Sequence, residues 1–166
     1  MTSAALLVVA LLAAAPGATV VAFEDVQEVV IRKMTTGPGE GYFKHYCVAV
    51  GPGTLGSPVT REARLQSVHL RPDPSPTLLS RLQLLSRRIV PASECDSNGE
   101  SVVHRGTKSR PALLIVVGPV EVVSADRVRV TAFSTSGFLT ETYSLVELVR
   151  KGGEWLIESD KILLQA

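Results

Sequence analysis

The spacing of hydrophobic residues changes along the chain, from a helical period in the first half to a strand pattern after residue 111. A helical period is clearest in Phe23–Thr36, whose apolar residues are Val26, Val29, Val30 and Met34. From Ala112 onward, apolar residues run continuously or alternate with polar ones, which is typical of strands. Helices first and strands last indicate an α+β fold rather than a series of βαβ units.

Two segments of the first half are predicted to be helices. Phe23–Thr36 carries Glu24 and Asp25 in its first turn, where the helix dipole favours acidic side chains, and Gly37-Pro38-Gly39 ends it. The second segment is Thr77–Arg88, whose apolar residues are Leu78, Leu79, Leu82 and Leu85. Ser75 and Pro76 precede it in the order expected for an N-cap and the first helical position.

The remaining apolar segments are predicted to be strands. Tyr42–Val50 is rich in aromatic and β-branched residues, and Leu65–Leu70 is expected to be a short extended piece. The later strands are predicted at Leu113–Val117, Val120–Val123 after a break or bulge at Gly118-Pro119, Val128–Ala132, Tyr143–Val149, Trp155–Ile157 and Ile162–Leu164. Gly152-Gly153 lies between two apolar runs and predicts a tight hairpin. We therefore expect an N-terminal helix packed on a curved antiparallel sheet of about four to six strands.

The first 22 residues differ in composition from the rest of the chain. Residues 1–22 contain no charged side chain and end in Val20-Val21-Ala22, so we interpret them as a secretory signal peptide cleaved before Phe23. Residues 23–166 then form a single α+β domain that is secreted or periplasmic. The alternative is an uncleaved N-terminal anchor, because the run is just long enough to span a bilayer. No other apolar run is long enough to do so.

The chain contains two cysteines, Cys47 and Cys95. In an exported protein an isolated pair is most simply a disulfide bond, so we predict that these residues are joined. The alternative is a catalytic thiol, which no neighbouring motif supports and which an oxidising compartment disfavours.

Charge and composition argue against a nucleic-acid partner. The formal net charge is +1 and aromatic residues make up 5% of the chain, so there is neither a basic surface nor a set of stacking side chains. The same charge gives no reason to expect binding to an anionic membrane surface.

Three motifs that can carry chemistry are weak in this chain. Gly51-Pro-Gly-Thr-Leu-Gly56 matches the dinucleotide-binding pattern, but Pro58 interrupts the helix that should follow, so we expect a Gly/Pro loop and no cofactor. His45, His69 and His104 are too far apart to form a recognisable metal motif. No G-x-S-x-G sequence is present, so a serine hydrolase has no local support.

A few side chains are nevertheless candidates for a binding site. His45 alternates with Lys44 and Tyr46 along a predicted strand, where it could face the mouth of a pocket. Trp155 follows the Gly-Gly turn and is expected to be a core or rim anchor. The candidate pocket residues are therefore Tyr42, His45, Tyr46 and Trp155. Glu154, Glu158 and Asp160 are most simply the solvated face and turn of a hairpin, although one such carboxylate could be a general base.

The last hairpin resembles a known fold. Tyr143-Ser-Leu-Val-Glu-Leu-Val-Arg-Lys-Gly-Gly-Glu-Trp-Leu-Ile157 resembles the closing hairpin of NTF2-like (cystatin-like α+β) proteins, in which a curved sheet surrounds a helix. Three further segments resemble a group of uncharacterised exported bacterial proteins with the same cysteine pair: Tyr46–Gly51, Asp73–Leu82 and Pro91–Cys95. The resemblance implies one disulfide-linked domain and brings no catalytic residue.

These observations lead to two functional hypotheses. The first is a non-catalytic domain that binds a small ligand or a partner protein in the cell envelope, without cofactor or metal. The alternative is a small NTF2-like hydrolase or isomerase, whose pocket should hold at least two ionisable groups from Tyr42, His45, Glu121, Glu141 and Asp160. Partner identity and oligomeric state, including a homodimer, stay open.

Overall fold

The computed structural model describes residues 22–36, 41–51, 68–98, 100–107, 111–137 and 140–165. The predicted signal peptide therefore lies outside the described residues except for Ala22. The same holds for the Gly51–Gly56 loop except for Gly51.

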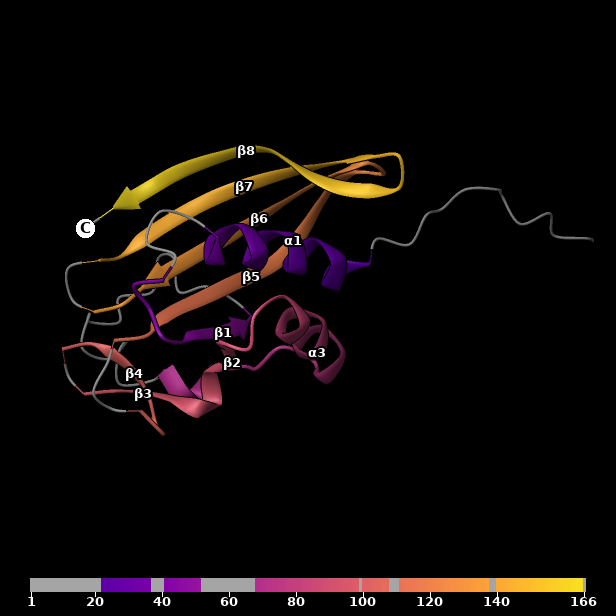
Figure 1. The fold of residues 1–166 in the computed structure, drawn as a ribbon. Helices are drawn as coiled ribbons and strands as arrows, with labels where there is room; N and C mark the ends of the chain where they lie inside the picture. Colours follow the sequence, from indigo (N-terminus) through magenta and orange to yellow (C-terminus); the bar gives the residue numbers. More distant parts are fainter. Residues whose placement is uncertain are drawn as a thin grey trace, which may run out of the picture.

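Both predicted helices are confirmed, and each ends earlier than expected. The first, α1, spans Phe23–Thr35 and buries one stripe that includes Val26, Val30 and Ile31. The second, α3, spans Pro76–Leu85 and begins as the sequence predicts, because the Ser75 hydroxyl accepts a hydrogen bond from Leu78 N at 3.1 Å. It ends three residues early because Ser86 has an extended backbone. Figure 1 shows α1 and α3 on the same side of the sheet.

The strands form one large sheet and one small one in the described part of the chain. The large sheet has the order β2-β1-β5-β6-β7-β8. Its strands are β1 (Tyr46–Val50), β2 (Ile89–Pro91), β5 (Leu113–Ser124), β6 (Arg127–Thr135), β7 (Thr142–Lys151) and β8 (Glu154–Gln165). The small sheet pairs β3 (Cys95–Ser97) with β4 (Val102–His104). Together with the helices, this arrangement confirms the α+β class.

The prediction of an antiparallel sheet is confirmed only in part, because the sheet is mostly antiparallel but mixed. Strand β1 runs parallel to both neighbours, with Tyr46 opposite Ile89 of β2 and Leu113 of β5. The chain crosses from β1 to β2 through α3, and such a crossover allows parallel pairing. Residues 46–49 of β1 are all buried, as is typical of a strand covered on both faces.

Two further strand predictions need correction. The segments predicted at Trp155–Ile157 and Ile162–Leu164 belong to one strand, β8, because the polar residues between them keep pairing with β7 across two register shifts. Val68–Leu70, predicted to be extended, is a short 3-10 helix, η1. The break predicted at Gly118-Pro119 is confirmed as an irregularity within a single strand β5, since the register with β6 shifts between Val117 and Val120.

The large sheet has a separate hydrophobic core on each face. On the α1 and α3 face, the buried cluster includes Val30, Ile31, Val48, Leu82, Ile115, Val130, Val146 and Leu148. The opposite face is covered by η1, by β3 and β4, and by a second short helix, η2 (Ala92–Glu94). Its buried cluster includes Cys47, Val68, Cys95, Val102, Leu114, Phe133 and Tyr143. Side chains therefore fill the space between α1 and the sheet, and a ligand site must be sought at its margins.

Candidate functional site

The structure does not bring the four candidate pocket residues together. Tyr46 is buried on the helix-covered face of the sheet, whereas Tyr42 is 71% exposed in the segment before β1. Trp155 lies in β8 and borders a groove of about 460 Å³ beside α1. His45 precedes Tyr46 and stacks against β4 through His104. The four candidates therefore lie in four different parts of the structure.

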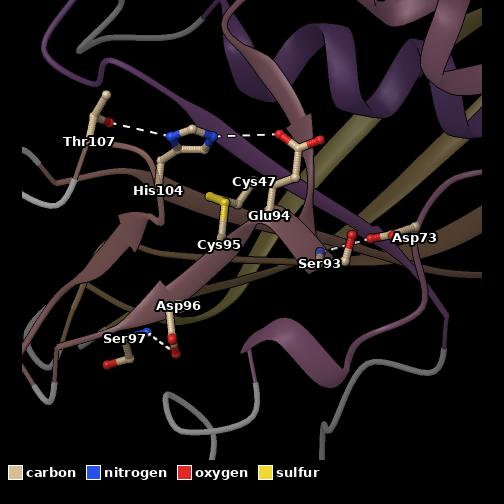
Figure 2. The surroundings of a disulfide bond; sticks show 9 residues. All are labelled: Cys47, Asp73, Ser93, Glu94, Cys95, Asp96, Ser97, His104 and Thr107. Carbon is tan, nitrogen blue, oxygen red and sulfur yellow. Dashed lines mark hydrogen bonds and ion pairs between the residues drawn. A yellow bond between two sulfur atoms is a disulfide. The ribbon is translucent and has the colours of Figure 1, made fainter.

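The predicted disulfide between Cys47 and Cys95 is present. Its Cα atoms are 6.2 Å apart, and it links β1 of the large sheet to β3 of the small one. Figure 2 shows that the imidazole of His104 lies between Glu94 and Thr107 close to this bond. His104 Nε2 is 3.5 Å from Glu94 Oε2, and its Nδ1 is 3.5 Å from the Thr107 hydroxyl. The disulfide thus links the small sheet to β1, and His104 lies beside it in contact with the residues that flank the small sheet.

His45 completes this attachment from the β1 side. Its ring stacks on that of His104, with centroids 4.1 Å apart and planes inclined by 21°. Burial lowers the pKa of His45, electrostatic repulsion by His104 lowers it further, and Glu94 acts in the opposite direction. The described residues contain no group of three or more His, Cys, Asp or Glu side chains placed to hold a metal ion. We therefore interpret the stacked pair as a structural contact.

The ionisable groups that would support an enzyme are dispersed. Glu121 lies on the exposed part of β5, where its carboxylate is 3.5 Å from Arg129 Nε. Asp160 of β8 pairs with Lys33 of α1, and Glu141 is buried before β7 begins. The four cavities lined by Trp155, Leu84, Arg88 and Tyr42 respectively each contain at most one group of the set Tyr42, His45, Glu121, Glu141 and Asp160 among the described residues.

A cavity of about 290 Å³ opens where α1, α3 and the start of β1 meet. It is more enclosed than the groove beside Trp155 or the shallow hollow that includes Tyr42. Its lining consists of Arg32, Thr35, Thr36, Tyr46, Leu85, Ser86 and Arg88. We call this space the helix-end cavity. Its polar groups are guanidinium and hydroxyl groups, with no carboxylate among the described lining residues.

Arg88 supplies the main positive charge of the helix-end cavity. Its guanidinium carbon lies 5.5 Å from the centroid of the Tyr46 ring, and one amino group donates to the carbonyl of Phe43 at 3.3 Å. The side chain is half-buried, and no carboxylate in the described part of the chain forms an ion pair with it. The remaining N–H groups of its planar fork therefore stay available for an acceptor.

The second guanidinium of the cavity is largely neutralised. Arg32 Nη2 is 3.0 Å from Glu28 Oε1, one turn earlier in α1, and the Arg32 side chain is 54% exposed. Arg32 therefore adds a weaker, more screened field, and Arg88 is the dominant site for an anionic group.

The backbone fixes Arg88 against β1. After α3 ends, Arg88 immediately precedes β2, and its carbonyl accepts a hydrogen bond from Tyr46 N at 2.9 Å. Its own N–H donates to the Ser86 hydroxyl oxygen at 3.3 Å. Both backbone polar groups of Arg88 are thus hydrogen-bonded, and its side chain lies over Tyr46.

Sequence reasoning missed Arg88 because it counted this residue as the last of the second helix. A usable signal existed in the change from Leu84-Leu85 to Ser86-Arg87-Arg88 before the apolar Ile89-Val90. That change indicates the end of a helix, but nothing local shows that Arg88 faces Tyr46, 42 positions earlier in the sequence.

No protein-family model, curated protein or solved structure matches the chain. Among the described residues, no helix is both long enough and apolar enough to cross a membrane. The helix-end cavity is therefore the candidate functional site.

Proposed function

We propose that this chain is a non-catalytic, exported binding domain whose helix-end cavity holds a small anionic ligand. The observation that carries the proposal is Arg88, whose half-buried guanidinium lies over Tyr46 without a carboxylate partner in the described part of the chain. A buried or half-buried charge normally has a partner, since its desolvation is otherwise uncompensated. A ligand carboxylate, phosphate or sulfate would supply that partner.

The chemistry of the cavity suits recognition of an oxyanion. A guanidinium can donate two parallel hydrogen bonds to a carboxylate or phosphate, and such charge-assisted bonds contribute about 1.5–3 kcal/mol each. Tyr46 holds the guanidinium plane from one side, which reduces the conformational freedom that binding would have to remove. The Ser86 hydroxyl accepts from Arg88 N and keeps its proton for the ligand.

The size of the cavity limits the ligand. A volume of about 290 Å³ lies at the low end of small-molecule sites. We therefore propose a ligand of metabolite size, smaller than a nucleotide. Binding rather than catalysis is supported because the described lining offers no general base or activated nucleophile beside Arg88.

Export and an NTF2-like fold belong to the same proposal. The Cys47–Cys95 bond supports an oxidising compartment such as the periplasm or the cell exterior. The packing of α1 on one face of a sheet that ends in the β7–β8 hairpin supports an NTF2-like arrangement. The filled space beneath α1 departs from a ligand-binding cone, so the proposed site lies at the end of the helix instead.

Titration with simple anions tests the proposed function. Acetate, succinate, phosphate and sulfate are added to the ¹⁵N-labelled protein, and binding is followed from the backbone amides of Tyr46 and Ser86. We expect saturable shifts with at least one of these anions. The Arg88→Gln variant should weaken the binding at least tenfold, because it removes the charge while Gln can still donate to Phe43 O.

Arg87→Gln is the matched control. Arg87 is exposed and lies outside the lining of the helix-end cavity, so its loss changes the net charge by the same amount. Equal weakening by both variants would show non-specific attraction and would contradict the proposal. Absence of saturable binding by every anion in the wild type would also contradict it.

A further inference from the structure

We propose that the ligand of the helix-end cavity is a small zwitterion, with a carboxylate at Arg88 and an ammonium group at the end of α1. This inference rests on the proposed function and adds the second charge of the ligand. It follows from the arrangement of donors and acceptors around the cavity.

Two helices end at the helix-end cavity. α1 ends at Thr35 with Thr36 as its C-cap, and α3 ends at Leu85 with Ser86 as its C-cap; all four residues border the cavity. The last carbonyl groups of a helix carry the negative end of its dipole, which favours a cation. Both basic side chains in the last turn of α1 are paired with carboxylates, Arg32 with Glu28 and Lys33 with Asp160. These pairs leave the negative end of α1 to a ligand cation.

The two threonines of α1 that line the cavity use their hydroxyl protons within the helix. Thr35 Oγ1 and Thr36 Oγ1 each donate their proton to the carbonyl of Arg32, at 3.0 Å in both cases. A hydroxyl has one proton to donate, so these two oxygens can only accept a further hydrogen bond. An ammonium group can donate to them, and a carboxylate cannot.

Ser86 and Arg88 offer donors to the same cavity. Ser86 Oγ accepts a hydrogen bond from Arg88 N, which leaves the Ser86 proton free, and the Arg88 guanidinium, which also lines the cavity, uses one amino group on Phe43 O. Apart from Arg32, whose guanidinium pairs with Glu28, donors are thus found at Arg88 and Ser86, and acceptors at Thr35 and Thr36. A ligand that carries only a negative charge can accept hydrogen bonds from Arg88 and Ser86. It has no donor for the oxygens of Thr35 and Thr36.

Matched pairs of acids test the inference. In 4-aminobutyrate an ammonium group replaces the terminal methyl of valerate, and the same relation links β-alanine to butyrate and glycine to propionate. Each pair is titrated by isothermal calorimetry against the wild-type protein at pH 7. We expect the best amino acid of the series to bind roughly tenfold more tightly than its methyl counterpart, given the negative end of α1 and the two hydroxyl acceptors.

The result depends on which member of each pair binds more tightly. If the site offered only Arg88 and apolar contact, the fatty acid would bind more tightly, because its methyl group could be buried beside Leu85. Equal or tighter binding of the methyl compounds would overturn this inference and leave the proposed function intact. Failure of both members of every pair to bind in an Arg88-dependent way would overturn the proposed function itself.

A Thr36→Val variant tests where the ammonium group binds. Thr36 is exposed at the helix end, so the substitution keeps the shape and removes the acceptor oxygen. We expect the preference for 4-aminobutyrate over valerate to fall by about threefold, as for loss of one modest hydrogen bond, while valerate affinity stays unchanged. An unchanged preference would contradict the placement of the ammonium group at α1.

Discussion

The imidazole of His45 stacks on that of His104, with ring centroids 4.1 Å apart, and this contact joins β1 to the small sheet. The folded state lowers the pKa of His45 below its ordinary value of 6.5, mainly by burial and then by electrostatic repulsion from His104. Well above pH 6.5 the residue is neutral in both states and contributes no pH dependence. As the pH falls through that value, the unfolded chain binds the proton more readily than the folded one does. The free energy of unfolding therefore decreases as the pH decreases.

We therefore predict that His45→Phe reduces the loss of stability between pH 7.5 and pH 5. Phenylalanine can still stack on His104 but does not titrate. The free energy of unfolding is measured in urea at both pH values, with His69→Gln as a control for the removal of a histidine elsewhere. An equal loss of stability in wild type and His45→Phe would show that His45 is not the group responsible.

Removal of the disulfide is predicted to be strongly destabilising. Cys47 and Cys95 are separated by 48 positions, and cross-linking a loop of this length contributes about 4 kcal/mol in the chain-entropy model. We expect the Cys47→Ala/Cys95→Ala variant to lose about that much unfolding free energy in urea. The intact mass of the protein purified from its native host, alkylated with and without reductant, should show two thiols only after reduction. Two free thiols before reduction would contradict the bond in the native protein.

The sequence predicted local structure well where a pair of adjacent residues determines it. Ser75 and Pro76 placed the start of α3, and Gly152-Gly153 placed the β7–β8 turn, where both glycines have positive φ angles of 60° and 90°. In each case the signal depends on residues that are adjacent in the chain, so no knowledge of the tertiary structure is needed.

Features that depend on distant residues could not be predicted in this way. The parallel position of β1 between β2 and β5 depends on Ile89-Val90-Pro91, a strand too short to give a pattern. The pairing of Arg88 with Tyr46 and the stacking of His45 on His104 likewise arise only after the sheet has formed. This is why the sequence grouped Tyr46 with His45, although their side chains contact different elements.

The N-cap of α3 gives a prediction with a matched control. Ser75 Oγ accepts a hydrogen bond from Leu78 N and donates one to Glu24 Oε1 at 2.6 Å, so it also links α3 to α1. Ser75→Ala should lower the free energy of unfolding by about 1 kcal/mol. Ser80→Ala, on the exposed side of the same helix, should be neutral or slightly stabilising, because alanine favours helices more than serine does. Equal losses in the two variants would exclude a specific capping effect.

Gly118 is predicted to tolerate no side chain. A Cβ atom at this position would lie 2.5 Å from Thr131 Oγ1 and 3.0 Å from the Thr131 carbonyl oxygen on the neighbouring strand. Gly118→Ala should therefore cost about 1–3 kcal/mol of unfolding free energy. Combining it with Thr131→Ala removes the closer contact, so the loss in the double variant should be smaller than the sum of the two single losses. Strict additivity would show that the side chain of Thr131 is not the obstacle.

The proposed anion site makes a prediction about the kind of positive charge that it needs. Arg88 lies over the Tyr46 ring, donates to Phe43 O and lines the helix-end cavity with a planar fork of donors. Arg88→Lys keeps the charge but replaces that fork by a compact ammonium group, which cannot form two parallel hydrogen bonds to a carboxylate. We expect Arg88→Lys to bind the best carboxylate roughly tenfold more weakly than wild type, and Arg88→Gln to bind it more weakly still.

Calorimetric titration of the three proteins at low and high salt separates the contributions of charge and geometry to the affinity, because salt screens the charge contribution and not the geometric one. Full affinity in Arg88→Lys would show that a point charge suffices and that the stacked guanidinium geometry has no role in recognition.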